Sequence, residues 1–200
     1  MIGQVAALRL YTTSTYTLVN NPLRASGGKL SEELRSSRHP LAVTTAHITK
    51  GLKKLRALNF NDIEDAGATR KIGSSQSASS KGDGDADGAR KVVSSYLWRG
   101  LKNVVVPDEF MSYGGSELGC MSTSESLKII ASYAASSSPL LFRIKIESPM
   151  DRGASLKWLS VYPAENEVLY PPLTYLKPML KQQIKGMDGE VVTLKAVFPS

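Results

Sequence analysis

The sequence predicts an α+β fold, with a helical part over residues 1–60 and a β-rich core over residues 92–200. Apolar residues recur at helical spacing in the first part and alternate as in strands in the second. Between them, residues 61–91 include a stretch at 72–90 that is rich in Ser, Gly and Asp and nearly free of large apolar side chains. Burial of such a stretch cannot offset its ordering entropy, so we expect a flexible insertion within one functional domain.

Three helices are expected before residue 60. Ile48, Leu52 and Leu55 lie at i, i+4 and i+7 and form one apolar stripe, with basic side chains around the rest of the helix. Two earlier helices are expected over residues 5–11 and 16–23, and a proline in the second leaves a break open.

Strand-like segments follow the insertion. They cover residues 92–98, 118–123, 140–147, 158–162, 165–169, 173–179 and 190–198. In the third of them Phe142 and Ile144 alternate with Arg143 and Lys145, which predicts one buried and one outward row. Two helices are expected between strands, one opening at Pro107 and one over residues 124–135.

Composition and charge restrict the class of protein. The apolar runs are too short to cross a bilayer, so no membrane span is expected, and the N-terminus lacks the pattern of a signal peptide. One cysteine, Cys120, excludes an intrachain disulfide framework and suits a reducing compartment. We therefore favour the cytoplasm and leave a secreted effector open. The net charge of +7 is compatible with anionic partners and equally with a lysine-rich soluble surface.

Two glutamates, two residues apart in a predicted strand, are candidates for a catalytic pair of carboxylates. Side chains two apart on a regular strand project to the same side, so Glu165 and Glu167 should point into one cleft. Repulsion between two close carboxylates should raise one pKa relative to the other. Such a pair suits cleavage of a glycosidic bond through an oxocarbenium-like cation. The alternative is an exposed pair at a sheet edge, screened by salt.

Two further segments each give only weak evidence for a binding site. The evidence is stronger when their order along the chain, ahead of the two glutamates, is taken into account. Arg99 is expected to end a strand and, followed by Gly100, suits a diphosphate bound by a guanidinium with close backbone approach. The hydroxyls of Ser122, Thr123 and Ser124 suit a carboxylate and a ribose, although short Ser/Thr runs commonly begin a helix.

In this order the segments resemble the arginine-specific group of mono-ADP-ribosyltransferases of the arginine-serine-glutamate type. The similar segments are residues 7–12 with Asn20, Leu23 and Arg24, then Trp98-Arg99-Gly100, residues 119–126 and residues 163–172. The resemblance implies a mixed or antiparallel β-sandwich core around a cleft for NAD. This chain departs from the family at Cys120-Met121, where the family usually has an aromatic residue before the Ser-Thr-Ser segment.

The resemblance also implies roles. Arg99 would contact the phosphate or ribose of NAD, Gly100 the nicotinamide amide, and Ser122 would orient the catalytic glutamate, with Thr123 and Ser124 beside the cofactor. Glu167 would bind the ribose 2′-hydroxyl and stabilise the cation. Glu165 would position the acceptor guanidinium and help to remove its proton. The expected partners are NAD and a protein with an exposed arginine, without a metal and without nucleic acid.

Other patterns compete with this interpretation. Asp83, Asp85, Asp87 and Gly88 match only the first half of a calcium-binding loop, and His39 and His47 have no carboxylate or cysteine cluster beside them. Two other functions stay open: an NAD glycohydrolase with water as acceptor, and a non-catalytic binding module that keeps the fold.

Overall fold

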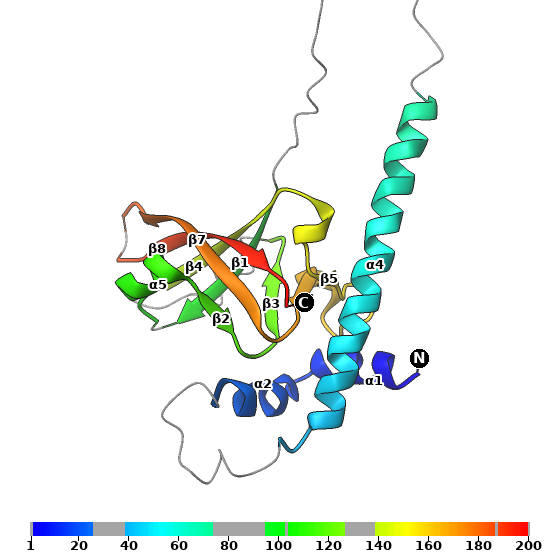
Figure 1. Ribbon diagram of the computed structural model, residues 1–200, viewed down its shortest axis with the longest axis horizontal. Coiled ribbons are helices and arrows are strands. Elements are labelled where there is room, and N and C mark those ends of the chain that lie inside the picture. The colour runs from blue at the N-terminus through cyan, green and yellow to red at the C-terminus, as the bar shows by residue number, and fades with distance from the viewer. Residues whose placement is uncertain are drawn as a thin grey trace, which may run out of the picture.

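The computed structural model describes residues 2–25, 39–73, 95–102, 104–126, 139–186 and 188–199. Within these ranges, three N-terminal helices are followed by a mixed sheet, so the predicted α+β class is confirmed (Figure 1). The helices are α1 (Ile2–Tyr11), α2 (Tyr16–Ala25) and α4 (Ala42–Gly73). Pro22 lies inside α2 and does not interrupt it. None of the described helices is both long enough and apolar enough to span a bilayer.

Helix α4 corrects the predicted boundary at residue 60. It continues to Gly73, so the first part of the expected flexible insertion at residues 61–91 is helical. Residues 61–72 contain alanine, acidic and basic residues, most of which are compatible with a helix, and the run dominated by serine and glycine begins only after them. The remainder of that predicted insertion, from residue 74 onwards, lies outside the described residues.

The eight strands in the described part of the chain form one sheet in the order β2-β7-β8-β4-β1-β3-β6-β5. They are β1 (Ser95–Lys102), β2 (Gly115–Glu117), β3 (Met121–Ser124), β4 (Pro139–Ile146), β5 (Ala154–Ser155), β6 (Glu167–Tyr170), β7 (Thr174–Gln183) and β8 (Glu190–Val197). Neighbouring described strands run antiparallel except for the parallel pair β4 and β8. A short helix, α5 (Asp108–Tyr113), begins after Pro107 as predicted.

The sheet divides at one narrow seam. Strands β1 and β3 are joined by a single register pair, Trp98 with Ser124, whereas β1 and β4 pair along their whole length. Buried side chains from both sides of the seam share one core, which includes Leu97 and Ile144 on one side and Val168 and Tyr170 on the other. The two parts of the sheet therefore face one another across this core, which gives the sandwich-like packing.

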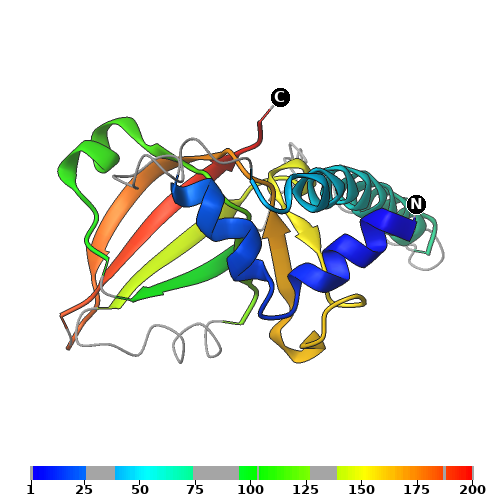
Figure 2. The same ribbon diagram turned by 90° about the horizontal axis from the view of Figure 1, so that it is seen from below.

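The N-terminal helices cover the opposite face of the smaller part, β3-β6-β5 (Figure 2). Leu8, Ile48 and Leu52 pack there with Cys120 and Leu169 in a second core. Side chains alternate along β6: Val168 and Tyr170 enter the first core, and Leu169 enters the second. By the same alternation Glu167 lies on the side of Leu169, toward the helices.

Several predicted strand boundaries are wrong. Residues 158–162 form turns, and the Trp158 side chain is largely exposed, because the alternation there reflects turn residues rather than a half-buried strand. Strand β2 occupies part of a glycine-containing segment that favours a turn in isolation, and its pairing with β7 makes it a strand. Ser124 ends β3, while residues 127–135 of the predicted helix lie outside the described residues.

Candidate active site

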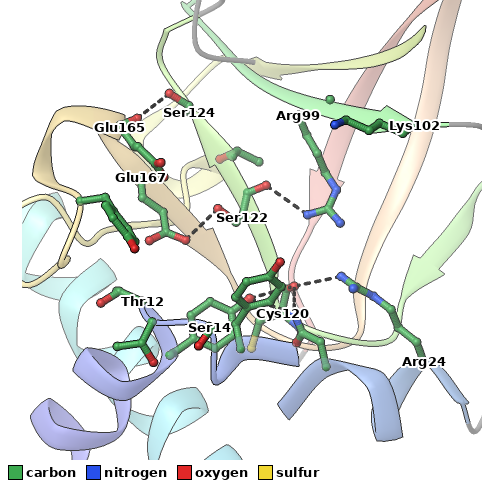
Figure 3. Close-up of a pocket in the computed structure, with 17 residues that line it drawn as sticks. Thr12, Ser14, Arg24, Arg99, Lys102, Cys120, Ser122, Ser124, Glu165 and Glu167 are labelled. Atoms are coloured by element: carbon green, nitrogen blue, oxygen red, sulfur yellow. Dashed lines mark hydrogen bonds between the residues drawn. The ribbon is translucent and has the colours of Figure 1, made fainter. Parts of the chain in front are cut away.

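A cavity of about 710 Å³ lies between the start of the chain and strands β1, β3 and β6. All seven residues that the sequence analysis singled out line it (Figure 3). They are Arg99, Gly100, Ser122, Thr123, Ser124, Glu165 and Glu167. Segments up to 68 residues apart in the sequence, from Arg99 to Glu167, thus meet at one cavity.

Ser122 and Glu167 form the centre of the site. The Ser122 hydroxyl donates to Glu167 Oε1 at 2.7 Å. Strands β3 and β6 are antiparallel with Ser122 opposite Leu169 and Ser124 opposite Glu167, so these side chains share the face toward the helices. A hydrogen bond to a carboxylate is short and strong, and here it fixes the side chain of Glu167.

Burial raises the pKa of Glu167, and the nearby Glu165 carboxylate raises it further, whereas the Ser122 hydrogen bond lowers it. The predicted direction is therefore confirmed, but repulsion between the carboxylates is not its main cause. Glu167 is only 9 % exposed, and removal of water disfavours the charged form of the group.

Glu165 reaches the cavity by a different route from the one predicted. It is the last residue of a 3-10 turn, η2 (Pro163–Glu165), and does not lie on the strand. Asn166 then adopts a left-handed backbone with φ 47°, which asparagine tolerates better than most residues. The Ser124 hydroxyl donates to the Glu165 carbonyl at 2.6 Å and ties this turn to the end of β3. The turn, rather than strand alternation, brings both carboxylates to one cavity.

The Thr123 side chain forms a hydrogen bond that links two strands. Its hydroxyl donates to the Val168 carbonyl at 2.7 Å, and the side chain is buried. It therefore joins β3 to β6 at the wall of the cavity.

Arg99 lies within β1, which corrects the prediction that it ends a strand. The strand continues to Lys102 because residues 95–102 pair with β4 over their whole length. Arg99 Nη1 donates to the Ser122 carbonyl at 3.1 Å, and Nη2 lies 3.7 Å from Glu117 Oε2. Burial lowers the pKa of Arg99 and the Glu117 carboxylate counteracts this effect. Gly100 follows it at the cavity wall.

Arg24 and Glu117 are site residues that the sequence analysis did not select. Arg24 lines the cavity from α2, and its Nε donates to Glu117 Oε1 at 2.9 Å. Arg24 belongs to the segment that carries the family resemblance, which was the available signal. Glu117 had no such signal, because it lies outside the segments that carry the resemblance.

Asn20 connects α2 to the beginning of β3. Its side-chain amide accepts from the Cys120 N–H at 2.9 Å and donates to the Cys120 carbonyl at 3.2 Å. A Cβ at Gly119 would lie 2.9 Å from Asn20 Oδ1, so this close approach requires glycine. Cys120 is buried, and burial raises the pKa of its thiol to about 12, which makes it a packing residue at neutral pH.

Within the described ranges, no group of three or more His, Cys, Asp or Glu side chains is arranged to hold a metal ion. His39 has structural contacts: its Nε2 bonds to the Val19 carbonyl and its Nδ1 accepts from the Leu41 N–H. Asp83, Asp85, Asp87 and Gly88, which match part of a calcium loop, lie outside the described residues.

An arginine, a serine and a buried glutamate thus lie around one cavity between the helices and the mixed sheet. The sequence model described as ADP-ribosyltransferase exoenzyme matches residues 2–188. The chain belongs to this family, within the arginine-serine-glutamate type, and NAD is its substrate. A comparison with curated protein sequences gave no match.

Solved structures of ADP-ribosyltransferases share the fold. The Vis toxin from Vibrio splendidus has a TM-score of 0.59 at 13 % identity, with 98 % of this chain and 74 % of that chain covered. HopU1 of Pseudomonas syringae pv. Tomato DC3000 has a TM-score of 0.60 at 14 % identity, with coverages of 97 % and 76 %. The Clostridium limosum C3 exoenzyme has a TM-score of 0.58 at 15 % identity, with coverages of 98 % and 86 %.

Proposed function

We propose that this enzyme transfers ADP-ribose from NAD to arginine side chains of a protein. The observation that carries the proposal is the presence of two carboxylates at one cavity, Glu167 buried and bonded to Ser122, and Glu165 on the turn before it. A guanidinium acceptor is attracted by a carboxylate and needs one beside it to lose a proton as the new bond forms.

The residues divide the reaction between them. The N–H groups of Arg99 that face the cavity bind the diphosphate of NAD, and Gly100 lets the backbone approach the nicotinamide amide. Glu167 binds the ribose 2′-hydroxyl and stabilises the positive charge that develops on the ribose. Ser122 holds Glu167 in place through its 2.7 Å hydrogen bond. Thr123 and Ser124 maintain the wall beside the ribose.

The chemical step exchanges one carbon–nitrogen bond for another. The bond between the ribose and nicotinamide breaks, and nicotinamide leaves with the bonding electrons. A nitrogen of the acceptor guanidinium then forms a bond to the same ribose carbon and releases its proton to Glu165. An arginine side chain has a pKa above about 12, so it is a weak nucleophile until such a base takes the proton.

Two related structures support the substrate and the acceptor. Exoenzyme S from Pseudomonas aeruginosa, which shares the fold at 18 % identity and a TM-score of 0.52, was solved bound to Carba-NAD. The Vis toxin was also solved in complex with agmatine, a small guanidinium compound, and that structure has a TM-score of 0.55 to this chain.

The test is to incubate the protein with labelled NAD, with and without agmatine. Label on agmatine is the expected result. Free ADP-ribose as the only product would identify an NAD glycohydrolase, and no consumption of NAD would identify a non-catalytic module and refute the proposal.

Substitution of the two glutamates separates their roles. We expect Glu167→Gln to abolish both transfer and hydrolysis, because it removes the charge beneath the ribosyl cation. Glu165→Gln should abolish transfer to agmatine and leave hydrolysis measurable. The control is Glu109→Gln on the exposed surface of α5, which should change neither activity. Equal loss of both activities in the Glu165 variant would contradict this division.

A further inference from the structure

Glu117 holds two cationic side chains that lie on different elements. Its Oε1 accepts from Arg24 Nε at 2.9 Å, and its Oε2 lies 3.7 Å from Arg99 Nη2. Arg24 comes from helix α2 and Arg99 from strand β1, and the carboxylate at the end of β2 is the group between them. One side chain thus links the helical part to the sheet at the cavity.

The position of Glu117 itself is fixed on several sides. Its Oε1 also accepts from the Gly119 N–H at 3.0 Å, and its carbonyl accepts from the Leu173 N–H at 2.8 Å. Strand β2 is hydrogen-bonded to β7, with Glu117 opposite Thr174. These contacts hold the Glu117 carboxylate in one position, in contrast to a freely moving surface side chain.

The geometry separates the carboxylate from the ligand side of the arginines. Arg24 and Arg99 line the 710 Å³ cavity, whereas Glu117 does not. A guanidinium carries more N–H donors than the contacts to Glu117 and to the Ser122 and Cys120 carbonyls use. Both arginines can therefore present N–H groups to an anion in the cavity while Glu117 holds them from behind.

Charge explains why this support matters. Two guanidiniums near one another repel: burial is the main cause that lowers the pKa of Arg99, Glu117 raises this pKa, and Arg24 lowers it further. The Glu117 side chain is 16 % exposed, so water screens these interactions only in part. Without the carboxylate, the arginines would separate and would have to be brought together again when an anion binds.

We propose that Glu117 is a positioning residue that pre-organises Arg24 and Arg99 as a two-arginine receptor for the diphosphate of NAD. This rests on the proposed function, in which Arg99 binds that diphosphate. Glu117 does not touch the substrate, so it contributes to binding in the ground state and in the transition state alike. Its removal should therefore raise KM for NAD and leave kcat close to the wild-type value.

The test compares Glu117→Gln with the wild type. Glutamine has nearly the same shape, but it loses the charge and turns an N–H donor toward one of the two arginines. We expect KM for NAD to rise about tenfold, as for a lost charge-assisted contact, with kcat within about twofold. The KM of Glu117→Asp, which keeps the charge on a shorter side chain, should lie between the KM values of the wild type and Glu117→Gln. Inhibition by nicotinamide alone, which lacks the diphosphate, should not change.

Glu147→Gln is the matched control. Glu147 also joins two cations, Lys145 and Lys195, each at 2.8 Å, but it is exposed and does not line the cavity. Its loss should leave KM unchanged. The combination of Glu117→Gln with Arg24→Ala should raise KM beyond Arg24→Ala alone, because Glu117 also positions Arg99, but by less than the product of the two single effects.

Calorimetry with ADP-ribose tests the proposal independently of turnover. The affinity should fall about tenfold in Glu117→Gln, in line with KM. An unchanged KM and ADP-ribose affinity, a fall in kcat at constant KM, or an equal loss of nicotinamide inhibition would overturn the assignment. A wild-type chain that consumed no NAD but bound ADP-ribose in a Glu117-dependent way would refute the proposed function and retain this inference.

Discussion

Replacement of Ser122 by alanine tests how strongly the proposed catalytic carboxylate of Glu167 depends on the Ser122 hydroxyl. The substitution removes the 2.7 Å hydrogen bond from Ser122 Oγ to Glu167 Oε1 and leaves the backbone of β3 in place. It also spares the Ser122 carbonyl, which accepts from Arg99 Nη1 at 3.1 Å. The change therefore isolates the hydroxyl from the other contact of the same residue.

The expected magnitude follows from the type of bond. A hydrogen bond to a charged group contributes about 1.5–3 kcal/mol, and each 1.4 kcal/mol corresponds to about a factor of ten in rate. We expect kcat to fall by about 10- to 150-fold if this contribution is made in the transition state. The Ser122 bond lowers the pKa of Glu167, so its loss should also move the acid limb of the pH–rate profile to higher pH.

The assay is nicotinamide release from NAD, measured for kcat and KM between pH 5 and pH 9. Ser155→Ala is the control, because Ser155 lies on β5 against the other edge of β6 and does not line the cavity. It should keep the wild-type profile. A Ser122→Ala enzyme with unchanged kcat and an unshifted acid limb would refute the reasoning that this hydroxyl supports the Glu167 carboxylate.

Two other predictions concern stability. Asn20→Ala leaves the buried Cys120 N–H without its acceptor, so the free energy of unfolding in urea should fall by about 1–3 kcal/mol; a smaller change would show that the helix–strand connection does not depend on this amide. Burial raises the pKa of Glu167, so the folded chain holds that proton more tightly than the unfolded chain, and stability is lost as pH rises through the raised value. Glu167→Gln removes this loss, so its Tm should exceed that of the wild type at pH 8 but not at pH 4, and an equal difference at both pH values would contradict the ionisation argument.

The meeting of the candidate residues at one cavity could be predicted where they lie close together in the sequence. The serine segment and the two glutamates were selected from short motifs, and all of them line one cavity. The reason given for Glu165 was nevertheless wrong, because a 3-10 turn and the left-handed Asn166 place it there. A spacing of two residues suggests that two side chains lie close together. It does not distinguish a regular strand from a turn that ends where the strand begins.

The fold was predicted best where periodicity is long. The apolar stripe of α4 and the alternation in β4 predicted buried faces that the structure shows for Ile48, Leu52 and Ile144. Residues 158–162 were wrong because short apolar runs fit a turn as well as a strand. The predicted helical part ended at residue 60, whereas α4 continues to Gly73. The low-complexity stretch, which begins at residue 72, was the better indicator of the end of the helix.

Periodicity and short motifs, which are local properties of the chain, indicated the fold class, the family and the candidate reactive groups. The tertiary structure decided the environment of those groups. Burial of Glu167, the support of Arg24 and Arg99 by Glu117 and the hold of Asn20 on Cys120 all join residues far apart in the sequence. Such partners are chosen by the packing of helices on strands, and no pattern of neighbouring residues encodes which distant group will lie beside which.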